Sequence, residues 1–241
     1  MHVLGLNKTT LLDYPGHVAA TVFTGGCQFR CPFCHNGELA LNSSCKSNYT
    51  QEDIFSFLQK RKNILQGICI TGGEPTLQSD LEDFIRGVRG LGYLVKLDTN
   101  GYEPDVLERL LVEGLLDYVA MDIKNCPGKY GVTAGREFLE IDRVERSVEL
   151  LKHSGIAYEF RTTVVRELHT IEDMVEIGKW IAGCPAYFLQ QYQADDNVIE
   201  VMRSGREDVY HGYDIDVMTK MAEAVRGLPG MTGEVILRGV D

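Results

Sequence analysis

Short apolar segments rich in β-branched residues recur along the whole chain and alternate with longer segments of a different spacing. Apolar segments of this kind, bounded by turn residues, are typical of buried strands. Six are predicted as strands, at residues 18–24, 68–71, 94–98, 118–123, 158–165 and 187–191. The intervening segments repeat apolar residues every three or four positions, as amphipathic helices do. The order strand, helix, strand, helix predicts an α/β fold with a mainly parallel sheet.

Residues that favour helix starts stand at the beginning of several of these segments. Thr50 can cap a helix with its hydroxyl, while the side chain of Asp53, in the first turn, can accept a hydrogen bond from the Thr50 amide in return. Ser79 and Glu82 repeat that arrangement before the next helix, and Pro104 opens a third. These signals predict where the helices between the strands begin.

The number of strand and helix units limits the architecture. About six units are enough for an open partial (β/α)6 barrel but too few for a closed barrel of eight strands, and a doubly wound sheet is the alternative. The chain has no linker or repeat, so residues 1–241 are predicted as a single domain with a core at about 16–195 and a C-terminal extension at 196–241. Residues 128–135 and 195–213 are predicted as loops, the second being a candidate mobile or partner-facing segment.

Composition and charge narrow the class of protein. The chain has 24 basic and 35 acidic side chains, for a net charge of -11. This surplus of acid argues against binding to nucleic acid or to an anionic membrane surface, since both need Lys and Arg to meet phosphates. No apolar segment approaches the roughly 18 residues of a membrane helix. The N-terminus lacks the pattern of a secretion signal, so the protein is expected to be cytoplasmic.

The strongest chemical signal is a group of three cysteines directly after the first predicted strand. Cys27, Cys31 and Cys34 are separated by three and then two residues. In a reducing compartment such a group indicates metal or redox chemistry before disulfide formation. Thiolates are the usual ligands of iron–sulfur clusters, and three of them leave one iron of a four-iron cluster open. An open iron can bind a substrate or a cofactor directly.

A structural zinc ion is the alternative for these cysteines, with His35 or Cys45 as its fourth ligand. The second pair of ligands that closed zinc sites usually contain is missing from the sequence. Cys69 lies within a predicted strand and is expected in the core, while Cys45, Cys126 and Cys184 are isolated. Free cysteines of this kind usually behave as small hydrophobic residues.

Further polar residues follow the next three predicted strands. The sequence Thr-Gly-Gly-Glu-Pro occupies residues 71–75, Asp-Thr-Asn-Gly occupies 98–101, and Met-Asp-Ile-Lys occupies 121–124. The carboxyl ends of parallel strands meet at one rim, and this rim holds the active sites of parallel barrels. The sequence therefore predicts one site that combines these residues with the three cysteines.

The cysteine spacing resembles that of the radical S-adenosylmethionine (SAM) enzymes. The resemblance implies the open partial barrel of the radical SAM type and a [4Fe-4S] cluster whose open iron binds the amino and carboxylate groups of SAM. It places Phe33 near the adenine of SAM. It also implies that Gly72, Gly73 and Glu74 meet the amino group of the methionine part, where the Glu74 carboxylate could accept hydrogen bonds from an ammonium.

The later strand ends are similar to those of the glycyl-radical-enzyme activases, a branch of this family. The resemblance implies that Asp98, Thr99 and Asp122 help to hold a monovalent cation beside the carboxylate of SAM, and that Lys124 lies near that carboxylate. Arg161, in the strand predicted at 158–165, is a candidate partner for a carboxylate or a ribose oxygen. A surface salt bridge is the alternative interpretation of Arg161.

Residues 5–16 and 34–36 resemble the activating proteins of anaerobic ribonucleoside-triphosphate reductase. The resemblance implies an oxidoreductase that takes an electron from flavodoxin or ferredoxin, cleaves SAM reductively and generates a glycyl radical on the reductase. Between Cys34 and Thr71 the chain has room for a single clear helix and none for a ferredoxin-like insert, so one cluster is expected.

Three other functions remain open at this stage. The first is activation of another glycyl radical enzyme, such as pyruvate formate-lyase. The second is a radical SAM reaction on a small molecule. The third belongs to a different class of protein, an iron–sulfur electron carrier or a zinc-stabilised binding module.

Overall fold

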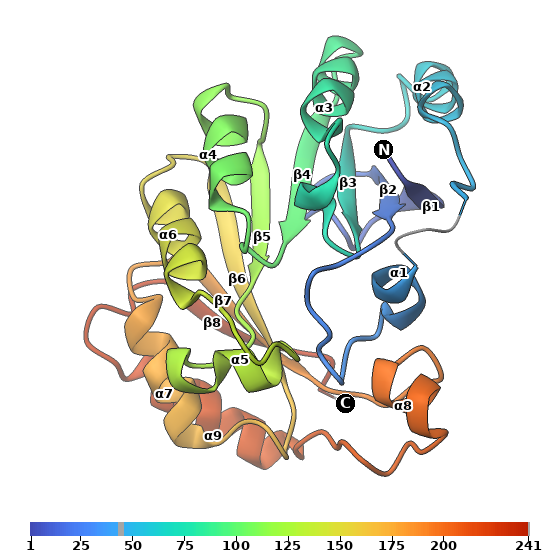
Figure 1. Cartoon of the computed structure of the whole chain (residues 1–241). Coiled ribbons are helices and arrows are strands. Elements are labelled where there is room, and N and C mark those ends of the chain that lie inside the picture. Colours follow the sequence, from blue (N-terminus) through green and yellow to red (C-terminus); the bar gives the residue numbers. More distant parts are fainter. Residues whose placement is uncertain (43–45, 241) are drawn as a thin grey trace.

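The computed structural model describes residues 1–42 and 46–240, and Figure 1 shows one curved sheet with helices packed along its outer side. The sheet contains eight strands, β1 Val3–Thr10, β2 Ala19–Thr24, β3 Gly67–Gly72, β4 Leu94–Thr99, β5 Tyr118–Asp122, β6 Ala157–Val164, β7 Ala186–Gln191 and β8 Glu234–Arg238. The predicted α/β class is confirmed.

The strand order distinguishes the two predicted architectures. The strands lie in the sheet in the order of the chain, from β1 to β8. From β2 to β8 every neighbouring pair is parallel, and β1 is antiparallel to β2. A doubly wound sheet would reverse its strand order in the middle, which this order excludes. In the described part of the chain β1 and β8 are the two edges, so the sheet is an open partial barrel.

Two strands were absent from the sequence-based prediction. The six predicted strands correspond to β2 through β7, whereas β1 and β8 extend the sheet at either edge. Each edge strand pairs with a neighbour on one side and keeps much of its surface exposed or half-buried. Neither therefore has the continuous apolar sequence by which the buried central strands are found.

Nine α-helices are described in these residues, α1 Gly37–Leu41, α2 Gln51–Lys60, α3 Leu81–Gly90, α4 Pro104–Val112, α5 Tyr130–Thr133, α6 Ile141–Lys152, α7 Ile171–Trp180, α8 Ile199–Ser204 and α9 Ile215–Arg226. Two short 3₁₀ helices, η1 Pro75–Leu77 and η2 Pro127–Lys129, accompany them. None of the described helices combines the length and the apolar character that crossing a bilayer demands.

One of the two predicted capping arrangements is confirmed. At the start of α2, Thr50 Oγ1 accepts a hydrogen bond from the Asp53 amide at 3.1 Å, and the Asp53 carboxylate accepts one from the Thr50 amide at 2.9 Å. The arrangement predicted for Ser79 and Glu82 is wrong, because Asp80 and not Ser79 occupies the N-cap position of α3. The Asp80 carboxylate makes no cap bond, since it accepts hydrogen bonds from the Gln51 side chain and from the N-terminal ammonium group.

The two segments predicted as loops contain helices. Residues 128–135 include part of η2 and all of α5, and residues 195–213 include α8. The helix α1 is a further addition to the single helix expected between Cys34 and Thr71, where Cys45 lies outside the described residues. Such short helices carry little periodic signal of their own, so tertiary contacts decide whether they form. Tyr130 at the start of α5, for example, is completely buried.

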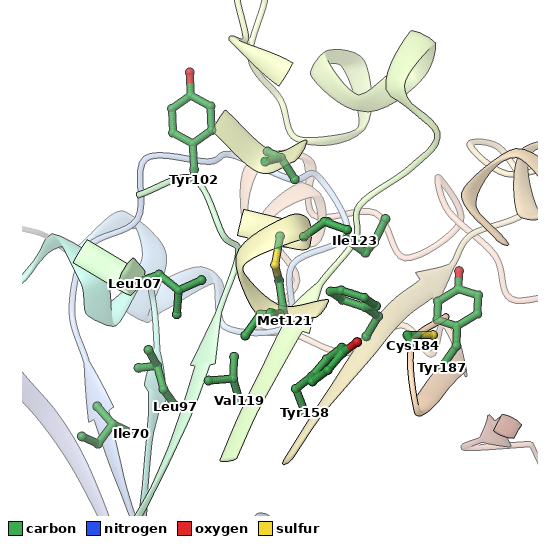
Figure 2. Packing of buried hydrophobic residues seen from close by; sticks show 14 of the residues in the cluster. Ile70, Leu97, Tyr102, Leu107, Val119, Met121, Ile123, Tyr158, Cys184 and Tyr187 are labelled. Atoms are coloured by element: carbon green, nitrogen blue, oxygen red, sulfur yellow. The ribbon is translucent and has the colours of Figure 1, made fainter. Parts of the chain in front are cut away.

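The core lies between the sheet and the helices. Register places Ile70, Leu97, Val119 and Tyr158 opposite one another on successive strands, and Figure 2 shows these side chains in a row. The first three are completely buried, which stabilises the fold by roughly 1.5–3 kcal/mol for each aliphatic side chain. Side chains alternate along a strand, so the residues next to these four on each strand point to the opposite, inner side of the sheet. That inner side is polar, and it leads to the site.

Candidate active site

One pocket at the carboxyl ends of the strands brings the predicted site residues together. Its volume is about 280 Å³. Its lining includes all of the predicted site residues, namely Cys27, Cys31, Phe33, Cys34, Gly72, Gly73, Glu74, Asp98, Thr99, Asp122, Lys124 and Arg161. These residues come from the loop after β2 and from the ends of β3, β4, β5 and β6, so the sheet brings distant parts of the chain to one rim.

The cysteine loop, residues 27–34, is held in place by elements far away in the sequence. The Arg30 amide donates to the carbonyl of Ala134, just after α5, at 2.9 Å. The Ile199 amide at the start of α8 donates to the Cys34 carbonyl at 3.2 Å. Figure 1 shows α1, α5 and α8 around this end of the sheet. The start of the segment predicted as a mobile or partner-facing loop is thus part of the support of the cysteines.

Burial sets the protonation of the three thiols. It raises the pKa of both Cys27 and Cys31 to about 12, and it also raises the pKa of Cys34. The positive charge of Lys124 opposes this effect at all three positions. The thiols are therefore protonated at neutral pH until a metal displaces the protons, which is how metal binding to cysteine is coupled to pH.

The donor set fits a cluster better than a single ion. Within residues 1–42 and 46–240, no three His, Cys, Asp or Glu side chains gather closely enough to hold one metal ion. A cubane cluster makes no such demand, because each thiolate binds a different iron. His35, suggested as a zinc ligand, places Nε2 at 2.5 Å from the Gln193 carbonyl instead. One buried and two half-buried thiols on one irregular loop therefore match the protein ligands of a [4Fe-4S] cluster.

Hydrogen-bond donors surround one of these thiols. The Cys27 sulfur accepts from the Phe29 amide at 3.3 Å and from the Asn100 side chain at 3.7 Å. Asn100 also contacts Gln28, which donates to its side-chain oxygen at 3.4 Å. Hydrogen bonds to ligand sulfurs are among the features by which proteins set cluster potentials. Neither Asn100 nor Gln28 was among the predicted site residues.

Gly72 and Gly73 are needed for close packing of the backbone. Gly72 has a φ of +115°, and a Cβ atom on it would lie 2.4 Å from the Thr24 amide. A Cβ atom on Gly73 would lie 2.1 Å from the Gly26 carbonyl oxygen. Both contacts are with the strand and loop that lead to the cysteines, so the two glycines let this segment lie directly against the cysteine loop.

The Glu74 carboxylate, for which the resemblance implies contact with an ammonium, accepts four hydrogen bonds from the protein itself. Oε1 accepts hydrogen bonds from the Thr76 amide at 3.1 Å, from the Thr76 hydroxyl at 2.6 Å and from the Thr99 hydroxyl at 2.7 Å. Oε2 accepts from the Asn100 amide at 2.7 Å. Burial raises the pKa of Glu74, and these four donors oppose the increase. Glu74 therefore joins the ends of β3 and β4.

Asp98, Asp122, Lys124 and Arg161 line the pocket. Together with Lys96, which is buried and not part of the lining, they form an array that we call the inner array. Arg161 donates to Asp122 at 2.9 Å and to Asp98 at 3.3 Å. Lys124 donates to Asp122 at 3.0 Å, and Lys96 donates to Asp98. Arg161 is 14% exposed and bridges both acids, which is incompatible with a surface salt bridge.

The cations of the inner array keep its acids ionised. Burial alone would raise the pKa of Asp122, but Arg161 and Lys124 outweigh burial and hold that pKa at about 2. The pKa of Asp98 is lowered in the same way, where Arg161 and Lys96 overcome the effect of burial. Lys96 was not predicted as a site residue. Its position two residues before Asp98, on the same face of β4, is the signal that could have revealed it.

Phe33 forms an apolar part of the pocket wall and contacts a buried histidine. The ring of Phe33 lies edge to face with that of His169, with centroids 6.4 Å apart. His169 Nε2 lies 2.8 Å from the Lys124 carbonyl, and the Val165 amide donates to Nδ1 at 3.0 Å. The lowered pKa of His169, caused mainly by burial, keeps the ring neutral. His169 thereby links Phe33 to the end of β5.

Comparison with known proteins places the chain in a family. The family model described as the Radical SAM superfamily matches residues 21–181. A protein of Methanocaldococcus jannaschii, named "Putative glycyl-radical enzyme activating enzyme MJ1227", is 35% identical over 198 residues, which cover 80% of this chain and 81% of that relative.

Solved structures share the fold at low sequence identity. Streptococcus suis SuiB bound to S-adenosylmethionine has a TM-score of 0.68 at 17% identity, and the match covers 90% of this chain and 49% of SuiB. The chain thus spans about half the length of that protein. A domain of pyruvate-formate lyase-activating enzyme from Bacteroides vulgatus has a TM-score of 0.54 at 13% identity, and the match covers 72% of this chain and 99% of that domain.

Proposed function

This chain belongs to the radical SAM superfamily, and from that premise we propose that it is an activating enzyme that generates a glycyl radical on a partner protein. Membership of the family implies a [4Fe-4S] cluster and SAM. The observation that carries the proposal is that the three cysteines and the polar ends of β3 to β6 line one pocket. The name of the Methanocaldococcus jannaschii relative supports the activase assignment.

Each part of the pocket has a proposed task. Cys27, Cys31 and Cys34 would hold the cluster, whose chemistry when bound would be the one-electron reduction that cleaves SAM. The positive side chains of the inner array attract the carboxylate of SAM. Phe33 would provide an apolar surface for the adenine, and the backbone of Gly72 is the proposed partner of the amino group. The walls of the pocket would shield the reacting part of the bound cofactor from water.

The proposed partner is anaerobic ribonucleoside-triphosphate reductase, on the resemblance of residues 5–16 and 34–36 to its activating proteins. Flavodoxin or ferredoxin is proposed as the electron donor. Pyruvate formate-lyase is the alternative partner. The open barrel favours a protein as the substrate, because a loop of the partner could reach the pocket from the open side of the sheet.

The test is a radical assay with the reconstituted protein. The chain, loaded anaerobically with iron and sulfide, is mixed with reductant, SAM and either the reductase or pyruvate formate-lyase. We expect a glycine-centred electron paramagnetic resonance signal with the reductase and stoichiometric 5'-deoxyadenosine. The Cys34→Ala variant should produce neither, whereas Cys184→Ala, which alters a cysteine outside the pocket, should produce both. Turnover that rises with a small metabolite and without any glycyl radical would contradict the proposal.

A further inference from the structure

The inner array leaves no place for the monovalent cation that the resemblance implies. We propose that Lys96 supplies the positive charge of that cation from within the protein, so that SAM binds without K⁺ or Na⁺. This inference rests on the proposed binding of SAM. It concerns the carboxylate end of the pocket and does not depend on which protein receives the radical.

Every carboxylate oxygen that was expected to bind the cation already has a partner. Of the two Asp98 oxygens, Oδ1 accepts from Lys96 and Oδ2 from Arg161. Of the two Asp122 oxygens, Oδ1 accepts from Arg161 and Oδ2 from Lys124. A metal cation at the same oxygens would lie against these positive groups, which is electrostatically unfavourable.

Thr99, the third residue expected to bind the cation, also has hydrogen-bond partners within the protein. The hydroxyl of Thr99 donates to Glu74 Oε1 at 2.7 Å and accepts from the Gly101 amide at 3.1 Å. Thr99 therefore serves the hydrogen bonds that join β3 to β4. The residues present do not fit a monovalent cation.

The charge of the inner array has the sign that a carboxylate requires. Lys96, Lys124 and Arg161 carry three positive charges and the two aspartates carry two negative ones, which leaves one positive charge. The neighbouring acid on the inner face, Glu159, does not cancel this surplus. It accepts from Tyr118 at 2.7 Å and faces its own cation, Arg238, at 3.7 Å.

Lys96 provides the surplus because of its position. Its side chain is only 3% exposed, and its ammonium lies beside Asp98 and 3.8 Å from the Cys69 sulfur. A buried ammonium keeps its charge only when an acid lies beside it. Without Lys96, two cations would face two acids and the inner array would have no net charge for a carboxylate. The carboxylate of SAM is therefore expected to depend on Lys96 and not on a dissolved ion.

The first experiment needs no variant. The affinity of the reconstituted protein for SAM is measured by isothermal titration calorimetry in potassium, sodium and tetramethylammonium chloride at equal ionic strength. The tetramethylammonium ion is too large for a site among these side chains. We expect dissociation constants that agree within about twofold in all three salts. An affinity that rises about tenfold or more, and saturates, with added K⁺ would overturn the inference.

The second experiment removes the internal charge. Lys96→Met keeps an unbranched side chain of nearly the same length without its charge. We expect it to bind SAM about tenfold more weakly in tetramethylammonium and to regain most of that loss in K⁺. Lys96→Arg keeps the charge and should remain indifferent to K⁺. The control Lys152→Met removes a positive charge from α6, where Lys152 pairs with Glu149, and should bind as the wild type does. Equal binding by Lys96→Met and the wild type in all salts would refute the role of Lys96.

Calorimetry and the radical assay test the two proposals independently. A protein that binds SAM equally in all three salts but produces no glycyl radical on any partner would contradict the proposed activase function and leave this inference intact. A protein that produces the radical but needs K⁺ to bind SAM would contradict this inference and leave the proposed activase function intact.

Discussion

Glu74 joins two strand ends through a single buried carboxylate. Its four donors come from Thr76, Thr99 and the amide of Asn100, and Asn100 in turn donates to the Cys27 sulfur. The carboxylate thus fixes a residue that contacts a proposed cluster ligand. This is a structural reason for an acid in the Gly-Gly-Glu sequence that differs from direct contact with the cofactor.

Replacement of Glu74 by Ala should be strongly destabilising. The change leaves four buried donors without their acceptor, and we expect a loss of unfolding free energy on the order of 3 kcal/mol. Urea unfolding followed by circular dichroism measures it. The control Glu223→Ala, at an exposed position of α9, should change stability by less than about 0.5 kcal/mol. Equal stability of the two variants would show that the hydrogen bonds of Glu74 contribute nothing.

Asp122 should make stability depend on pH in the acid range. Its pKa in the folded protein is about 2, below the ordinary value of 3.8. Because the folded pKa is the lower one, the stabilising contribution is complete above pH 3.8 and is lost as the pH falls toward about 2. Asp122→Asn should therefore flatten the fall of the unfolding free energy in this range.

The matched control for this pH experiment is Asp216→Asn, at an exposed position in the first turn of α9. It should retain the pH dependence of the wild type. An Asp122→Asn variant that loses stability with acid as steeply as the wild type would contradict the assignment of this dependence to Asp122.

At the scale of elements, short helices support the cysteine loop. The first residues of α8 donate to carbonyls of that loop, and the Gly37 amide of α1 donates to the Asn197 carbonyl at 3.0 Å. A Cβ atom on Gly37 would lie only 2.4 Å from the same Asn197 oxygen. The absence of a side chain at Gly37 therefore permits α1 and the chain before α8 to meet.

Gly37→Ala tests this contact between elements. The new methyl group must push residue 197 away, so we expect a loss of about 1–3 kcal/mol in stability and a faster loss of iron from the reconstituted protein. Iron release to a chelator and urea unfolding measure the two effects. Gly90→Ala, at the end of α3, is the matched control, because its Cβ atom would meet nothing within 4 Å. If both variants retained iron equally, the contact would have no part in holding the cysteine loop.

At the scale of the whole molecule, the sequence predicted the central elements and missed those that depend on neighbours. The buried strands β2 to β7 and the capped helix α2 have strong local signals, whereas β1, β8, α5 and α8 are defined by what they pack against. The grouping of the site residues could be predicted, since parallel strands share one rim. The pairing within that site could not, because it depends on register.

The ion pairs of three predicted site residues, Asp98, Asp122 and Arg161, depend on the register of the strands. Asp122 lies opposite Arg161 on the neighbouring strand, and Asp98 lies on the same strand face as Lys96. Sequence spacing shows the second relation but not the first. The resemblance alone made the carboxylates of Asp98 and Asp122 candidate ligands of a cation, whereas in the structure they form ion pairs with side chains.

The attachment of the cysteine loop to residue 199 has a consequence for biogenesis. While the ribosome is still making the first three-quarters of the chain, the amide that holds the Cys34 carbonyl does not yet exist. The thiols can then meet oxygen or stray metal ions before their loop is fixed. Delivery of iron and sulfide should accordingly follow the synthesis and docking of the segment that contains Ile199.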